Sequence, residues 1–293
     1  MMTESDRGTA LVGEPINGFF TVLRPGNNIQ HATDRCPPGE SILLTPGVYT
    51  LKRGLKIVKA INIFGRDATL ELWGEDGETD AIIHSTADAA IIGVVMRESE
   101  RLQDMHNPTM VTAFKVIGGS LHIQSCKVEE MIGGVFVNDA NVTVVDCEIK
   151  TLNIVTAYSA KVNIERCKLF SVCDYGIMAS GPQTRLTIRD SQLFYGCDMI
   201  DITKGATLIM ERNVVDGCNR ALVLRRINFR ESRIVDNKFC VYQHGITIVA
   251  PATRKNAWPR FACIKNNDCV HPDGHVIANA IVNAATDNND FMD

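Results

Sequence analysis

The sequence is poor in aromatic residues and lacks the features that usually mark a membrane protein or a zinc protein. Phe, Trp and Tyr make up 6% of the 293 residues, which is a small supply of rings for a sugar-binding groove. No apolar run approaches the ~18 residues of a transmembrane helix. The polar first fifteen residues, which include Asp6, Arg7 and Pro15, contain no apolar segment typical of a secretory signal. The ten cysteines form no CxxC pair and therefore predict neither zinc nor another metal site.

These absences predict where the protein works and what it does not bind. Without a secretory signal, we expect reduced thiols and a cytoplasmic location, with no membrane association. Lys and Arg number 30 against 34 Asp and Glu, interleaved along the chain, so no basic block indicates a nucleic-acid partner. No Gly-rich phosphate loop lies between a strand and a helix, and no nucleophile elbow is present, so no cofactor is expected.

What the sequence does contain is a short pattern that recurs seven times between Leu121 and Asn267. Each copy has an aliphatic residue, two variable residues, a small polar residue, a variable residue and a second aliphatic residue. The small polar residues, at steps of 21, 20, 24, 22, 24 and 30, are Cys126, Cys147, Cys167, Ser191, Asn213, Asn237 and Asn267. A period of 20–50 residues is typical of a solenoid. We expect these side chains to stack as a structural ladder at one corner, the cysteines as buried thiols and the asparagines hydrogen-bonded along the column.

The repeats predict short strands. Apolar residues alternate in Leu121-x-Ile123 and Val142-x-Val144, which is the period of a strand with one buried face. Similar pairs such as Ile200-x-Ile202 predict further strands in most repeats. Strands joined this way should run parallel and wind right-handed. The predicted fold is all-β, a right-handed parallel β-helix of about ten coils in one elongated domain.

The pattern also predicts the limits of the solenoid. Residues 1–26 are expected to form an N-terminal extension that becomes ordered near Phe20, residues 27–283 the β-helix, and residues 284–293 an acidic tail. A short helix capped by Asn28 should end before Pro37. That helix either caps the open end of the first coil or is an ordinary connection.

Two segments carry a resemblance to a known family. The stretch IQHATDRCPPGESILLTPGVYT (29–50), followed by LKIVKAINIFG (55–65), resembles the opening coils of pectin-lyase-like right-handed β-helix proteins. The likeness is greatest to the CASH-type repeats of polysaccharide-active proteins and of F-box and Shc-binding intracellular adaptors. With the later repeats it extends over roughly residues 28–283. The resemblance implies the fold but not the activity, since the superfamily holds lyases, hydrolases, epimerases and non-catalytic modules.

The resemblance implies that, if this protein is an enzyme, its active site contains a cluster of Asp residues beside Arg, Lys or His. The hydrolase motifs are absent; for example, Arg226-Ile227 is followed by Asn228 and not by the lysine of the Arg-Ile-Lys motif. The nearest match is a second predicted ladder of Asp174, Asp198 and Asn219, beside Cys173, Cys197 and Cys218 and with Asp201, Asp216 and Arg220 nearby. Carboxylates one coil apart could hold a cation or share a proton. Alternatively, they are turn residues that bond the local backbone, so no catalytic residue is assigned.

Two insertions interrupt the repeats, at residues 97–112 and 250–262. Both are predicted to be loops, and the second offers Arg254, Trp258 and Arg260 as contact residues. The histidines show no metal-ligand spacing and are expected on surface loops; those considered are His84, His106, His122, His244, His271 and His275.

These observations favour a non-catalytic intracellular interaction or scaffold module with a protein partner. The missing acid motifs and the low aromatic content weigh against an enzyme. The alternative is a polysaccharide lyase or hydrolase that uses the Asp174 and Asp198 ladder.

Overall fold

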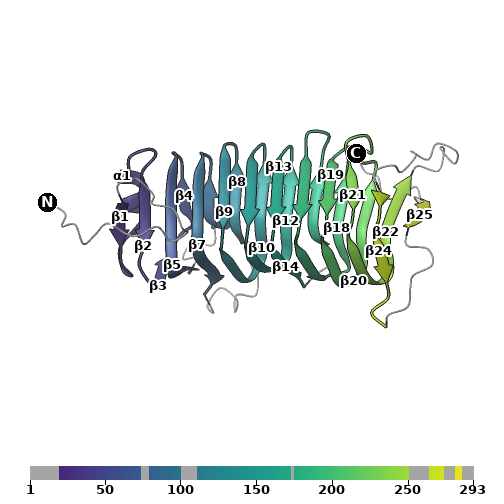
Figure 1. Ribbon diagram of the computed structural model, residues 1–293. Coiled ribbons are helices and arrows are strands. Elements are labelled where there is room, and N and C mark those ends of the chain that lie inside the picture. Colours follow the sequence, from purple (N-terminus) through teal and green to yellow (C-terminus); the bar gives the residue numbers. More distant parts are fainter. Residues whose placement is uncertain are drawn as a thin grey trace. The chain divides into compact units, whose positions relative to one another are not determined.

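The protein is a right-handed parallel β-helix of about ten coils, as the repeats predict. The structure is a computed structural model that describes residues 20–73, 79–99, 111–172, 175–250, 264–273 and 281–285. The chain divides into two compact units, residues 1–151 and 152–293. Within each unit the strands lie side by side in parallel rows (Figure 1).

The first unit contains one described helix and eleven complete strands. They are β1 (Phe20–Leu23), α1 (Ile29–Arg35), β2 (Ser41–Leu44), β3 (Gly47–Leu51), β4 (Leu55–Ile57), β5 (Ile61–Leu72), β6 (Ala81–Ser85), β7 (Ala89–Glu98), β8 (Thr112–Ile117), β9 (Ser120–Gln124), β10 (Lys127–Asn138) and β11 (Asn141–Val145). One row runs β1–β2–β5–β7–β9–β11, a second β3–β5–β7–β10 and a third β4–β6–β8–β10. All of these pairings are parallel.

The second unit repeats this arrangement, and the boundary at residue 151 falls within β12 (Glu148–Tyr158). Its other strands are β13 (Lys161–Glu165), β14 (Lys168–Ser171), β15 (Tyr175–Ser180), β16 (Arg185–Arg189), β17 (Gln192–Tyr195), β18 (Asp198–Thr203), β19 (Thr207–Glu211), β20 (Val214–Arg225), β21 (Arg233–Val235), β22 (Lys238–Ala250), β23 (Ile264–Lys265), β24 (Asp268–Val270) and β25 (Ile281–Ala285). The rows are β13–β16–β19–β21–β23, β14–β17–β20–β22–β24 and β12–β15–β18–β20–β22–β25.

Aliphatic columns form the core of each unit, because the alternation along each strand puts like residues in register from coil to coil. In the first unit one column consists of Ile42, Ile63, Ile91, Ile123 and Val144, all fully buried. In the second, Ile177, Ile200 and Leu222 align in the same way. Each such side chain contributes about 2 kcal/mol by leaving water.

The N-terminal helix begins as the sequence predicts. The Asn28 Oδ1 atom accepts a hydrogen bond from the His31 backbone N–H at 2.9 Å, which satisfies a helix donor that would otherwise be free. The Gln30 side chain exchanges two hydrogen bonds with the Lys56 backbone and so fastens the helix beside β4. Strand β1 begins at Phe20, the residue near which order was expected, and pairs with β2 although it lies inside the segment taken as an N-terminal extension.

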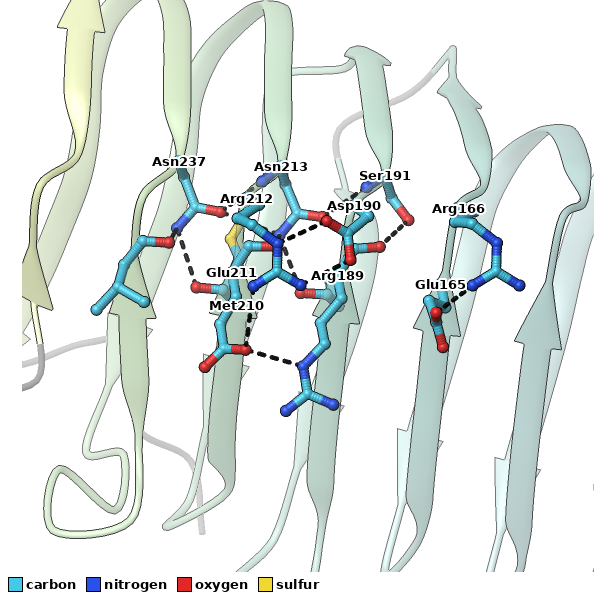
Figure 2. Close-up of polar contacts among 12 residues, drawn as sticks. Glu165, Arg166, Arg189, Asp190, Ser191, Met210, Glu211, Arg212, Asn213 and Asn237 are labelled. Carbon is cyan, nitrogen blue, oxygen red and sulfur yellow. Dashed lines mark hydrogen bonds and ion pairs between the residues drawn. The ribbon is translucent and has the colours of Figure 1, made fainter.

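The predicted ladder is present in each unit, at a corner with left-handed backbone. The residues that precede the ladder positions have φ between 50° and 56°; they are Ser125, Asp146, Arg166, Asp190, Arg212, Asp236 and Asn266. This turn directs the next side chain into the corner. In the first unit the Cys126 N–H donates to Cys147 Sγ at 3.4 Å. In the second, the N–H groups of Ser191 and Asn213 donate to the next asparagine Oδ1, each at 2.9 Å (Figure 2).

The ladder cysteines Cys126, Cys147 and Cys167 are buried thiols that form no disulfide, as predicted. The one helix in the described part of the chain has seven residues, so no described helix could span a membrane.

Candidate functional site

A cluster of acidic and basic side chains lies on the β15–β18–β20–β22 row of the second unit. The core-facing positions of this row are aliphatic, for example Ile200 and Ile202 on β18. Because strand side chains alternate, Asp201 between them points away from the core. By the same alternation and register, Arg225 and Thr247 share the outer face of the row with Asp201, although Asp201 is only 6% exposed.

The first part of the cluster is an ion pair between register partners on adjacent strands. The Arg220 guanidinium on β20 donates two hydrogen bonds to the Asp198 carboxylate on β18, both at 2.6 Å. The Asp198 side chain is 5% exposed and that of Arg220 34%, so the carboxylate lies beneath a guanidinium that reaches solvent. Tyr175 on β15 and His244 on β22 are the next partners on either side of this pair.

The second part of the cluster is less completely paired. The Arg225 Nε and Asp201 Oδ1 atoms are 3.5 Å apart, which permits charge attraction but leaves neither atom with a hydrogen bond to the described residues. His244 Nδ1 and Thr247 Oγ1 on the neighbouring strand are likewise buried and without a hydrogen-bond partner in the described part of the chain. Four unpaired polar atoms thus occur on β18, β20 and β22.

Burial changes the acidity of the central carboxyl. Desolvation raises the pKa of Asp201 above its ordinary value, although Arg225 lowers it; Asp198 adds to the rise and Arg220 opposes it. These influences require the two carboxyls and two guanidiniums to be electrostatic neighbours. Asp201 is accordingly biased toward the protonated form, whereas Asp198 is held in two charge-assisted hydrogen bonds.

The structure corrects the predicted second ladder. Asp198 lies opposite Arg220 and not opposite Asn219, whose Nδ2 atom instead contacts Cys197 Sγ at 3.7 Å. The prediction placed Cys197 opposite Cys218, which is a step of 21 residues. The register of Asp198 with Arg220 shows that this coil advances by 22 residues. Of the predicted candidates, Asp198 and Arg220 are therefore brought together. Asp174, Arg254, Trp258 and Arg260 lie outside the described residues.

Sequence reasoning did not assign Arg225, His244 or Thr247 to a site. It placed His244 on a surface loop, but this residue lies within strand β22 and is half-buried; His84 and His122 also lie in strands. A signal was available for His244, because it follows its register partner Arg220 by 24 residues, one coil of this part of the chain. Arg225 is the register partner of Thr203 and not of Asp201, so the coil period alone would not have related it to Asp201.

A second charged column on the same unit provides a structural contrast (Figure 2). The exposed Arg212 donates two hydrogen bonds to Asp190, at 2.7 and 2.8 Å. Glu211 forms ion pairs with Arg189 at 2.9 Å and with Arg233 at 3.1 Å. No side-chain atom of these residues is a buried atom without a partner within the described segments, so this column needs no ligand to complete it.

No group of three or more His, Cys, Asp or Glu residues that could hold a metal ion occurs among the described residues. The chemistry that the cluster offers is proton transfer at Asp201 and anion binding at the guanidiniums.

The comparisons with known proteins concern the fold. The chain matches the family model described as "Right handed beta helix region" over residues 93–256, more than half of its length. Two solved structures are similar to it: a pectin methylesterase variant in complex with a hexasaccharide (12% identity, 90% of each chain covered, TM-score 0.49), and the A-module of the mannuronan C-5 epimerase AlgE4 of Azotobacter vinelandii (10% identity, 88% of this chain and 93% of that chain covered, TM-score 0.31). At these values neither likeness bears on activity, and no curated protein matches the chain. The family match and the coil architecture together show that the chain belongs to the right-handed β-helix family.

Proposed function

We propose that the protein is a carbohydrate-active enzyme that cleaves an acidic polysaccharide, as a lyase or a hydrolase, at the outer face of β18, β20 and β22. The observation that carries this proposal is the set of four buried polar atoms, on Asp201, Arg225, His244 and Thr247, that have no hydrogen-bond partner among the described residues. An unpaired buried polar group costs about 1–3 kcal/mol, so folded proteins normally avoid it. A bound ligand that supplies the missing hydrogen bonds would remove this cost.

The charges of the cluster favour an anionic ligand. Burial raises the pKa of Asp201, and the Arg225 Nε atom faces the Asp201 Oδ1 atom at 3.5 Å, with neither atom hydrogen-bonded among the described residues. Arg220 is already engaged by Asp198. A carboxylate on a uronic acid would give Arg225 a planar, bidentate partner, whereas a neutral sugar would leave it without one.

The same arrangement supports cleavage of a glycosidic bond. Protonated Asp201 would donate its proton to the leaving oxygen as the bond to the neighbouring sugar carbon breaks, and would later regain a proton from water. In a hydrolase, water adds to the anomeric carbon and releases a proton. In a lyase, a base removes a ring proton next to the carboxylate and a carbon–carbon double bond forms; the unpaired His244 Nδ1 is a suitable acceptor.

The proposal is tested by assaying the full chain on polygalacturonate and alginate, with a neutral glucan as substrate control. We expect cleavage of an acidic polymer, a fall in kcat of about 100-fold or more in Asp201→Asn, and an increased KM in Arg225→Gln. The matched control is Asp190→Asn, which alters an exposed Asp–Arg pair on the same unit and should leave kcat and KM unchanged. An ultraviolet-absorbing double bond in the product distinguishes the lyase from the hydrolase.

Two results would overturn the proposal: no cleavage of any acidic polymer by the wild-type protein, or full activity of Asp201→Asn.

The protein partner, the scaffold role and the cytoplasmic location expected from the sequence stay predictions. The contact residues assigned to the scaffold role, Arg254, Trp258 and Arg260, lie outside the described residues. Recovery of a stoichiometric partner from native extract would test the scaffold role directly.

A further inference from the structure

An exposed aromatic platform lies on strands β14 and β17 of the unit that carries the acidic cluster. The Phe170 and Phe194 rings, on the paired strands β14 and β17, stack with centroids 4.8 Å apart and an interplanar angle of 13°. Tyr195 extends this pair, with its ring centroid 6.4 Å from Phe170 and 6.3 Å from Phe194. The Tyr195 side chain is 57% exposed, so one edge of the platform faces solvent.

Tyr195 also has an unusual backbone conformation. Its φ is 67°, and it is the only aromatic residue among the thirteen described non-glycine residues with positive φ. The other twelve are Asp, Ser, Arg, Lys or Asn. A bulky residue in the left-handed region is strained, and strain of this kind is maintained mostly at functional positions.

The next coil shows what the same turn looks like without that strain. Continuing the register of Phe194 with Asp216 places Gly217 opposite Tyr195, and Gly217 has a φ of 76°. A Cβ atom on Gly217 would lie 3.4 Å from the Cδ1 atom of Tyr195, an ordinary van der Waals contact, so it is the positive φ and not the tyrosine ring that favours glycine at this position. The turn therefore accepts glycine, and its backbone conformation does not require the tyrosine at the first position.

The platform and the acidic cluster are continuous along the chain and across the row. Tyr195 ends β17, and β18 begins three residues later at Asp198. Tyr175, 41% exposed, is the register partner of Asp198 on the adjacent strand. Two exposed tyrosines thus flank the Asp198–Arg220 pair, one along the chain and one across the sheet.

We infer that Tyr195, supported by Phe170 and Phe194, is a stacking residue for a sugar ring of the polysaccharide bound at the Asp201 and Arg225 cluster. This inference rests on the proposed function and adds that the substrate is an oligomer, one unit held by the guanidiniums and another by the aromatic platform. Aromatic rings bind the apolar face of a pyranose by the contacts that make exposed tyrosines effective in interfaces. The backbone strain at Tyr195 is retained because the ring is required there.

The test measures binding of hexagalacturonate, hexamannuronate and monomeric galacturonate by calorimetry, together with KM and kcat on the cleaved polymer. Tyr195→Gly removes both ring and strain, whereas Tyr195→Phe keeps both. We expect Tyr195→Gly to bind an acidic hexasaccharide roughly tenfold more weakly and to raise KM with little change in kcat. Its Tm should equal or exceed that of the wild type. Tyr195→Phe should bind as the wild type does, and monomer binding should not respond to either substitution.

Failure of this inference is distinguishable from failure of the proposed function. If an acidic hexasaccharide binds and Arg225→Gln weakens it but Tyr195→Gly does not, the stacking role is wrong and the site at Arg225 stands. If Tyr195→Gly lowers Tm and affinity together, the ring is structural and the inference is overturned. If no acidic hexasaccharide binds the wild-type chain, both proposals fall.

Discussion

Two polar columns on the unit formed by residues 152–293 differ in how completely they are hydrogen-bonded. In the ladder, the Asn213 amide donates to the carbonyl groups of Ile188 and Glu211 and accepts from the Ser191 N–H. In the cluster, Asp201 and Arg225 leave buried atoms without partners among the described residues. The first column completes its hydrogen bonds within the fold, whereas the second leaves bonding capacity for a molecule outside it.

The contrast extends to two chemically identical ion pairs. Asp190 with Arg212 and Asp198 with Arg220 are both bidentate and both separated by 22 residues. They differ in burial: the Asp190 side chain is 38% exposed and that of Asp198 5%. Exposed pairs contribute little to stability because solvent screens them, while a buried carboxylate depends on its partner. Spacing alone therefore identifies the pairing but not its role.

The largest expected effect is loss of the ladder bonds at Asn213. Asn213→Ala removes the acceptor of the Ser191 N–H and the donor to two carbonyl groups, all buried, and should lower the free energy of unfolding by about 4 kcal/mol. Asn163→Ala, on an exposed strand position of the same unit, should change it little. Chemical denaturation of both variants measures the difference. Equal stability of the two would mean that the ladder does not hold the corners.

The next effect separates the two ion pairs. Arg220→Ala leaves the Asp198 carboxylate buried without its two hydrogen bonds, and we expect a loss of about 3 kcal/mol in the free energy of unfolding. Arg212→Ala breaks the exposed pair and should have no measurable effect at physiological salt. Denaturation of the two variants under the same conditions decides the point. A similar loss in both would show that burial does not distinguish these pairs.

The coils and the ladder could be predicted because both repeat. Alternation such as Leu121-x-Ile123 and the spacing of Cys126, Cys147 and Asn213 reflect a local rule that every coil obeys. The strand β1 itself was not predicted, although order was expected from near Phe20, since β1 is isolated from the repeats along the chain and depends on pairing with β2.

The site could be predicted only in part, because it depends on register. Asp198 and Arg220 were found by aligning the coils on Cys197 and Cys218, but a shift of one residue placed Asn219 opposite Asp198 in the prediction. His244 resembled a scattered surface histidine, since nothing local marks its position beside Arg220. The burial of Asp201 and the strain at Tyr195 arise from packing across several coils, which no short stretch of sequence encodes.

The smallest effect compares Asp201 with a buried carboxyl that faces no guanidinium among the described residues. Glu98 ends β7 in the unit formed by residues 1–151, and its Oε1 atom has no hydrogen-bond partner among the described residues. Burial raises the pKa of Glu98 from 4.5 to about 7. Below pH 4.5 the carboxyl is protonated in the folded and unfolded states alike. As pH rises toward 7, the unfolded state loses its proton first, so the protein loses stability across this interval.

Glu98→Gln should remove that loss, because the amide stays neutral at every pH. We expect the variant to match the wild type at pH 4 and to exceed its free energy of unfolding by about 2 kcal/mol at pH 8. The control is Glu71→Gln, which alters a carboxylate of the same unit that is paired with Arg97 at 2.8 Å and should give no such gain. Denaturation at pH 4, 6 and 8 tests this. If Glu98→Gln were no more stable than the wild type at pH 8, the charged form of Glu98 would have a partner. The comparison between an unpaired buried carboxyl and Asp201, which faces Arg225, would then fail.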